Sequence, residues 1–262
     1  MIQLQPESTV TKTNKRICVV CHLYYEDLWP EIEDYLSALP PHGLDVTLSD
    51  KPIHNSDTLK NLPASAYIEQ SENRGRDILP FLRMYARIRE RTNYDYILKI
   101  HTKKSFHTDG FGEVWRKAMF ETLMYNWQDC FKELAKPTVG MVTDSHFVLP
   151  THITRRCSLA INKTCDALKW HEKHACFAAG SMFWVKAGVL DDLTDFALKM
   201  QWEREIDAKD GATPHIVERL FGLAVKNHGM TMAGVSSNGS DELCGEYERL
   251  YRKSVQQKLI GG

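Results

Sequence analysis

The sequence predicts one three-layer α/β/α domain with a Rossmann-like, mostly parallel sheet. Strand and helix patterns alternate along most of the chain, which is typical of strands joined by crossover helices. The run Tyr96–Ile100 is apolar at nearly every position, as in a strand buried on both faces of a parallel sheet. A length of 262 residues with 43% hydrophobic side chains is enough for one large core. We expect a flexible leader at 1–15, the domain at 16–236 and a charged tail, compatible with a helix, at 237–262.

The remaining elements follow from local periodicity and from Gly and Pro positions. In chain order the sequence predicts a strand at Arg16–His22, a helix at Glu26–Ala38, a strand at Leu44–Leu48, a short helix near Ser56–Leu62, a strand at Ala66–Glu69, a helix after Asp77, the strand at Tyr96–Ile100, a helix at Phe111–Leu134, a strand at Thr138–Thr143, a partly helical stretch at Thr164–Lys173, a strand at Phe177–Trp184, and helices at Lys186–Met200 and Ala212–Asn227.

Ionisable and hydroxyl side chains follow the buried strand directly. They are Lys99, His101, Thr102, Lys103 and Lys104. In open α/β sheets ligands collect at the carboxyl ends of such strands, and several ammonium groups favour a phosphate or diphosphate. The alternative is that Lys103 and Lys104 belong to a solvated loop.

A second polar cluster, Asn73–Asp77, precedes the helix expected after Asp77. Gly75 permits positive φ, and Asp77 is a suitable N-cap. Arg74 and Arg76 beside a helix N-terminus predict an anion site at the same edge of the sheet. The alternative is that Asn73 and Asp77 only cap the helix and the arginines only solubilise it.

Two later segments add candidate site residues. Small residues that include Gly180 and Ser181 allow close approach to the backbone, by a substrate or by a packed strand. His215, Glu218 and Arg219 share one face of a predicted helix, and that face is either catalytic or an ion-paired surface.

Composition excludes several classes of protein. A net charge of −1 argues against a strongly cationic nucleic-acid binder. Seven scattered cysteines favour a reducing cytosol over a disulfide framework, and Cys18 and Cys21 lie inside a strand pattern, where a redox or zinc role is not favoured. Apolar runs are far shorter than the roughly 20 residues that span a bilayer, so we expect membrane contact to be peripheral at most.

Four segments taken in series resemble the rhamnan synthesis protein F family of bacterial polysaccharide assembly. They are HLYYEDLWPEIEDYLSALP, SENRGRDILPFL, YDYILKIHTKKS followed by Trp115 and Arg116, and FAAGSMFWV with DGATPHIVERLFG. The resemblance covers roughly Arg16 to Gly229. It implies an A-type glycosyltransferase fold and a role in rhamnose-containing polysaccharides such as the O-antigen of lipopolysaccharide. It also implies a cytoplasmic enzyme, peripheral at the inner face of the membrane or in contact with an assembly complex.

The resemblance further implies a deoxythymidine- or guanosine-diphosphate deoxysugar as donor, plausibly a rhamnose donor, and a lipid-linked glycan as acceptor. Tyr24 would stack on the base, and the two basic segments would hold the diphosphate. The residues that would line the sugar and acceptor pocket are Trp115, Arg116, Gly180, Ser181 and His215.

The chain departs from the Asp-x-Asp motif with which many such transferases hold a divalent metal. Lys99 to Lys103 contains no carboxylate, and hard cations need oxygen ligands. We therefore expect no metal cofactor, with Lys103 and Lys104 neutralising the leaving diphosphate. An acceptor base is still required in an inverting displacement. Asp210 is the first choice and Glu218 the second.

Two other readings stay open at this point. Loss of the Asp-x-Asp motif is compatible with a catalytically silent member that binds glycan or serves as a scaffold. A phosphotransferase that uses His101 and the basic cluster on a sugar phosphate is the other, although no Asp or Ser nucleophile is evident beside His101.

Overall fold

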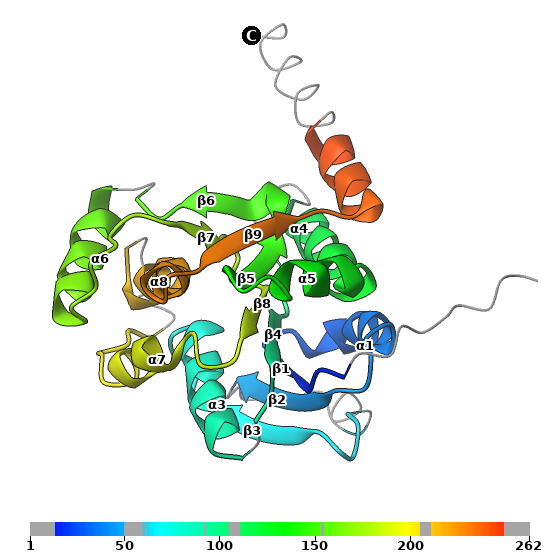
Figure 1. Cartoon of the computed structure of the whole chain (residues 1–262). Helices are drawn as coiled ribbons and strands as arrows, with labels where there is room; N and C mark the ends of the chain where they lie inside the picture. Colours follow the sequence, from blue (N-terminus) through cyan, green and yellow to red (C-terminus); the bar gives the residue numbers. More distant parts are fainter. Residues whose placement is uncertain are drawn as a thin grey trace, which may run out of the picture.

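The computed structural model describes residues 14–49, 60, 62–91, 93–104, 111–152, 155–204 and 211–248. These residues build a seven-stranded sheet of order β3-β2-β1-β4-β8-β5-β9 (Figure 1). The strands are β1 (Ile17–Leu23), β2 (Gly43–Ser49), β3 (Tyr67–Ser71), β4 (Tyr96–His101), β5 (Val139–Asp144), β8 (Phe183–Lys186) and β9 (Thr231–Val235). All neighbours pair in parallel except β8, which runs antiparallel between β4 and β5.

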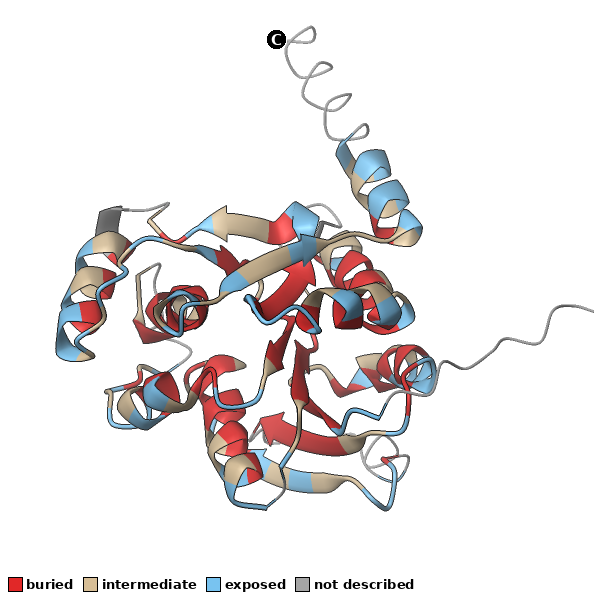
Figure 2. Ribbon diagram, viewed as in Figure 1, coloured by how far each residue is buried: buried red, intermediate tan, exposed pale blue. Residues whose placement is uncertain are grey.

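Helices cover both faces of this sheet, which confirms the predicted three layers. One buried cluster joins the sheet to α1 (Trp29–Ser37), α4 (Phe111–Phe120) and α5 (Trp127–Leu134). The other joins it to α3 (Ile78–Arg91), α6 (Arg155–Ala167), α7 (Asp191–Ala197) and α8 (Thr213–Asn227). Figure 2 shows the buried residues concentrated where these helices meet the strands. A 3-10 turn at Glu26–Leu28 precedes α1, and a π-helical segment at Glu121–Tyr125 lies between α4 and α5.

Strands β1 and β4 are buried at every position, as the apolar runs predict. Cys18 and Cys21 illustrate the two faces, because the first packs in one core cluster and the second in the other. Both thiols are unpaired, and burial raises the pKa of each far above its usual range. They therefore act as small apolar core residues.

The region from 145 to 200 differs most from prediction. The expected strand Phe177–Trp184 is two strands, because positive φ at Gly180 and Ser181 turns the chain between β7 (Cys176–Ala178) and β8. Strand β7 pairs with β6 (Val148–Pro150), outside the central sheet. Helix α6 begins before the predicted stretch at Thr164–Lys173, and α7 is shorter than predicted.

Further differences lie near the ends of the domain. Strand β9 follows α8 and was not predicted, because its five residues carry little β-branched or alternating pattern. Residues 238–248 are helical, and this helix extends from the end of β9 (Figure 1). The predicted helix near Ser56–Leu62 lies almost entirely outside the described residues.

Helix α8 packs unusually close to β7 at Gly222. A Cβ built there would lie 1.8 Å from the carbonyl oxygen of Cys176. We expect Gly222→Ala to lower the free energy of unfolding by about 1–3 kcal/mol through overpacking. Gly245→Ala is the matched control, because nothing lies within 4 Å of its built Cβ and alanine favours a helix. Equal denaturation midpoints for the two variants would contradict this packing.

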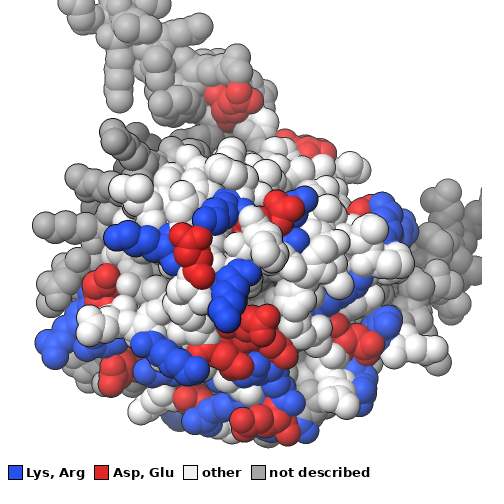
Figure 3. Space-filling view, turned by 60° about the vertical axis from the view of Figure 1, so that its left-hand side comes forward, with Lys and Arg blue, Asp and Glu red and all other residues white. Residues whose placement is uncertain are grey.

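Charges on the face of Figure 3 are mixed, with Lys and Arg interleaved among Asp and Glu. Ion pairs at the surface include those of Arg89 with Asp191 and Asp195. Among the described residues, no helix combines the length and the apolar character needed to cross a bilayer.

Candidate functional site

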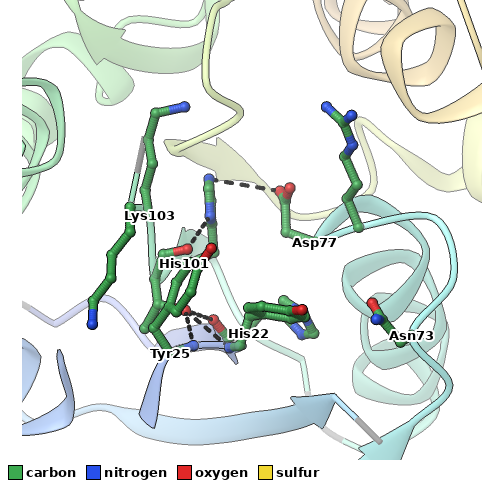
Figure 4. Close-up of a pocket in the computed structure, with 10 residues that line it drawn as sticks. His22, Tyr25, Asn73, Asp77, His101 and Lys103 are labelled. Atoms are coloured by element: carbon green, nitrogen blue, oxygen red, sulfur yellow. Dashed lines mark hydrogen bonds and ion pairs between the residues drawn. The ribbon is translucent and has the colours of Figure 1, made fainter. Parts of the chain in front are cut away.

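A cavity of about 270 Å³ opens at the carboxyl ends of β1 and β4, beside the N-terminus of α3 (Figure 4). Parallel pairing brings these ends together, since His22 lies opposite His101. The loop before α3 supplies the third side. The lining residues are His22, Tyr24, Tyr25, Asn73, Arg76, Asp77, His101, Thr102, Lys103 and Lys104. The two basic segments predicted to meet at one sheet edge therefore do so.

A smaller cavity of about 80 Å³ lies beside the first. Four residues line both cavities, and they are Arg76, Asp77, His101 and Lys103. The smaller cavity is completed by the turn at Gly180 and Ser181 and by His215 and Glu218 of α8. Arg76 and Lys103 thus lie where the larger cavity, which has Tyr24 and Tyr25 in its wall, meets the smaller cavity, which adds Glu218 to the shared Asp77.

Asp77 is the centre of the hydrogen-bond network at this junction. Its Oδ2 accepts from Lys99 Nζ and from Ser181 Oγ, and lies 3.8 Å from His101 Nε2. Burial disfavours the charged carboxylate, but attraction to His101 and Lys99 outweighs burial and holds the pKa of Asp77 far below its usual range. The prediction that Asp77 serves as an N-cap is therefore incomplete: it stands just before α3, and its carboxylate bonds to β4 and the turn before β8.

Two left-handed turns face this carboxylate. Gly75 and Arg76 have φ of 71° and 55°, and Gly180 and Ser181 have φ of 82° and 52°. Positive φ is uncommon for residues other than glycine and clusters at functional sites. At Gly75 a side chain is also excluded by space, because a Cβ would lie 2.6 Å from Leu79 Cβ.

Arg76 and Lys103 are the cations that reach both cavities. Arg76 Nη1 donates to His215 Nε2 at 3.0 Å. Because arginine can only donate, His215 Nε2 is the acceptor and the ring proton lies on Nδ1. Lys103 Nζ lies 4.2 Å from the centroid of the Trp115 ring. Burial lowers the pKa of Lys103, although attraction to Asp77 and Glu218 opposes that shift. An anionic ligand beside Lys103 would favour its ammonium form and raise its pKa again.

Glu218 is the second carboxylate of the smaller cavity, beside Asp77. Its Oε1 accepts from the Gly180 N–H at 2.8 Å, and its Oε2 lies 3.6 Å from Arg219 Nη1. Burial and the nearby charge of Asp77 raise the pKa of Glu218. A carboxylate with a raised pKa in a cleft suits general base catalysis.

Both histidines at the strand ends are held rigidly. His101 Nε2 lies 2.8 Å from the Gly180 carbonyl oxygen and Nδ1 lies 3.0 Å from that of Thr102, and the neutral ring donates to one of the two. Burial lowers the pKa of His101, with Asp77 acting in the opposite direction. His22 bonds to the hydroxyls of Thr47 and Ser49 on β2. Such contacts fix the walls of the larger cavity.

Several predicted ligand contacts have other roles in the fold. Lys99 is 1% exposed and lines neither cavity, because its ammonium bonds to Asp77 and Ser181. Arg74 turns away, and its Nη1 donates to the Trp202 carbonyl at 2.5 Å. Thr102 lines the larger cavity, yet its hydroxyl accepts from the Tyr24 and Tyr25 N–H groups.

The predicted acceptor residues Trp115 and Arg116 support the loop that carries the lysines. Arg116 is buried, forms a two-pronged ion pair with Glu31 and donates to the Lys103 carbonyl at 2.7 Å. Trp115 stacks on Phe147 and would contact a Cβ at Gly180 at 3.1 Å. Sequence reasoning missed Glu31, and no local signal links it to Arg116, which is 85 positions away.

The remaining predicted residues either line the larger cavity or lie outside the described residues. Tyr24, Asn73, Arg76, Lys103 and Lys104 line the larger cavity. Lys104 also pairs with Asp27. Asp210, the first choice of base, lies outside the described residues. Within the described ranges, no group of three or more His, Cys, Asp or Glu side chains is arranged to hold a metal ion.

Comparison with known proteins agrees with these motifs. The family model described as "Rhamnan synthesis protein F" matches residues 1–230. The uncharacterised protein WxcX of Xanthomonas campestris pv. campestris, from strains B100 and ATCC 33913, is 32% identical over 229 residues. That match covers 81% of this chain and 32% of WxcX, so the chain spans about a third of the length of these relatives. The family description supports a role in polysaccharide biosynthesis. With a family match over most of its length, the chain belongs to the rhamnan synthesis protein F family.

Proposed function

We propose that the chain is a glycosyltransferase domain that moves a sugar, such as rhamnose or another deoxysugar, from a nucleoside diphosphate to a glycan acceptor. The observation that carries the proposal is the pair of joined cavities with Arg76 and Lys103 at their junction. A nucleotide sugar has the same order of parts. The nucleoside fits the larger cavity beside Tyr24, Tyr25 and Asn73, the diphosphate fits the cations, and the sugar fits the smaller cavity.

The chemistry assigned to the site is a single displacement. The acceptor hydroxyl oxygen attacks the anomeric carbon, the bond from that carbon to the diphosphate oxygen breaks, and Glu218 takes the hydroxyl proton. Arg76 and Lys103 stabilise the negative charge that develops on the leaving diphosphate. In this scheme Arg76 and Lys103 neutralise the diphosphate charge that a divalent metal neutralises in other transferases. Lys104 adds positive charge in the larger cavity.

The family description supports the further proposal that the acceptor is a glycan of a cell-surface polysaccharide, carried on a lipid. The domain would then act on the cytoplasmic side of the membrane, in peripheral contact with the membrane or with an assembly complex. In WxcX the matching region is about a third of the protein, so the acceptor and the membrane contact are proposed and not inferred from that match.

A thermal-shift panel tests donor binding and metal dependence together. Uridine, guanosine and deoxythymidine diphosphates are added with EDTA and, separately, with manganese. We expect at least one nucleotide to raise the melting temperature in EDTA, because ligand at 100 times its Kd stabilises the fold by about 2.7 kcal/mol. The matching nucleoside without phosphate is the control. A shift that requires manganese would contradict metal-independent binding, and no shift from any nucleotide would contradict the donor site.

A further inference from the structure

In the described part of the chain, Lys99 is the one lysine near the cavities that is wholly buried. All the hydrogen bonds that its ammonium can donate go to protein atoms. Its Nζ donates to the carboxylate of Asp77, to the Ser181 carbonyl at 2.8 Å and to the Ser181 hydroxyl at 2.8 Å. These three acceptors match the three donors of an ammonium group. The aliphatic stem reaches them past Phe81, whose ring centroid lies 5.4 Å from Nζ.

These contacts join three separate parts of the fold. Lys99 belongs to β4, Asp77 stands at the start of α3, and Ser181 lies in the turn that leads into β8. Ser181 also donates directly to Asp77, which closes a triangle of side chains. We call these three residues the Lys99 lock. Breaking a buried charged pair leaves an uncompensated charge, so each member depends on the others.

The lock lies between the two left-handed turns. Arg76 immediately precedes Asp77, and Gly180 immediately precedes Ser181. Arg76 and Ser181 both hold φ near 50–55°, an unfavourable conformation for side chains of this kind, and such conformations persist only where surrounding contacts fix them. Anchoring the neighbouring side chains to one buried ammonium supplies such contacts.

Each turn presents a group that the site needs. The first directs Arg76 to the junction of the cavities. The second directs the Gly180 N–H to Glu218 and the Gly180 carbonyl to His101. The position of Glu218 relative to Arg76 is therefore set through residues that Lys99 holds.

We propose that Lys99 is a positioning residue, whose buried side chain, held by Asp77 and Ser181, keeps Arg76 and Glu218 in register. The proposal rests on the function proposed above. It assigns to Lys99 a role distinct from that of Lys103, which faces the ligand. Lys99 lines neither cavity and acts through Asp77, Ser181 and the turns they anchor.

The test compares Lys99→Met with Lys186→Met. Lys186 lies on β8 opposite Tyr96 at the far end of β4, and its Nζ bonds to the Lys136 carbonyl. We expect Lys99→Met to lower kcat by about 10²-fold, the effect of misplacing reacting groups by about 1 Å. Hydrogen exchange of the Gly180 amide should accelerate in the same variant. Lys186→Met should match the parent in both measurements. Unchanged kcat and exchange in Lys99→Met would overturn the proposal.

A double variant separates positioning from stability. Lys99→Met with Asp77→Asn removes both buried charges and should recover most of the melting temperature lost in Lys99→Met. We expect kcat to stay low in the double variant, and recovery of both quantities would overturn the proposal. If Lys99→Met does not fold, Ser181→Gly removes the hydroxyl and tolerates the positive φ, and parental kcat and Gly180 exchange there would overturn it. Amide exchange is read on the free protein, so it tests the lock even if no sugar transfer is found.

Discussion

Glu218→Gln is expected to lower the rate of sugar transfer by roughly 10²–10⁴-fold, the usual contribution of a general base. Nucleotide affinity should change little, because the acceptor proton moves only in the transition state. Glutamine keeps the size of the side chain and can still accept from the Gly180 N–H. It cannot take a proton from the acceptor. Transfer is measured as nucleoside diphosphate released per enzyme per second.

The pH profile gives this prediction a second readout. Burial and Asp77 raise the pKa of Glu218, and a base works only when deprotonated. Transfer by the parent protein should therefore rise with pH through a limb above the ordinary range of a glutamate, and Glu218→Gln should lack that limb. Glu133→Gln on α5 is the matched control, since Glu133 pairs with Lys136, three positions along the chain, and lines neither cavity. A folded Glu218→Gln protein with near-parental transfer would place the base elsewhere, with Asp210 the next residue to replace.

Lys103→Ala and Arg76→Ala are each expected to weaken nucleoside diphosphate binding by about 1.5–3 kcal/mol, the value of a hydrogen bond to a charged group. That range corresponds to roughly 10- to 150-fold in Kd. Both residues line both cavities, so both can contact the same diphosphate. Isothermal titration calorimetry at fixed ionic strength measures the change.

Lys132→Ala is the control for loss of one positive charge, because Lys132 is exposed on α5 and pairs with Asp129. Affinity for the nucleoside without phosphate should be similar in all these proteins. If neither Lys103→Ala nor Arg76→Ala alters the affinity for the diphosphate, the junction of the cavities is not the phosphate site.

The sequence allowed most of the sheet and the edge at which the cavity opens to be predicted, because both depend on local patterns. Buried strands such as β4 show as apolar runs, and the rule that ligands gather at their carboxyl ends placed Lys103 near Arg76 without any knowledge of side-chain contacts. The antiparallel strand β8 was missed as a separate element. The turn that precedes β8 depends on positive φ at Ser181, and a serine in the sequence does not predict that conformation.

The roles of individual charged residues were less predictable. Lys99 and Lys103 look alike in sequence, yet one is buried against Asp77 and the other faces the cavities. Lys99 lies within β4 and Lys103 lies two residues beyond its end, and the position of α3 and of the turn before β8 decides which of them is buried. Arg74 and Arg76 differ for a similar reason, because left-handed backbone at Gly75 and Arg76 sends their side chains in different directions.

The most direct test of the central claim is the product of the reaction itself. The protein is incubated in EDTA with a panel of nucleoside-diphosphate deoxysugars and a rhamnose oligosaccharide acceptor, and the acceptor is analysed by mass spectrometry. The account predicts an acceptor heavier by one sugar residue and release of an equal amount of nucleoside diphosphate. An acceptor heavier by one phosphate would identify a phosphotransferase, and an unchanged acceptor with every donor, despite nucleotide binding, would contradict the transferase and favour a glycan-binding or scaffold domain.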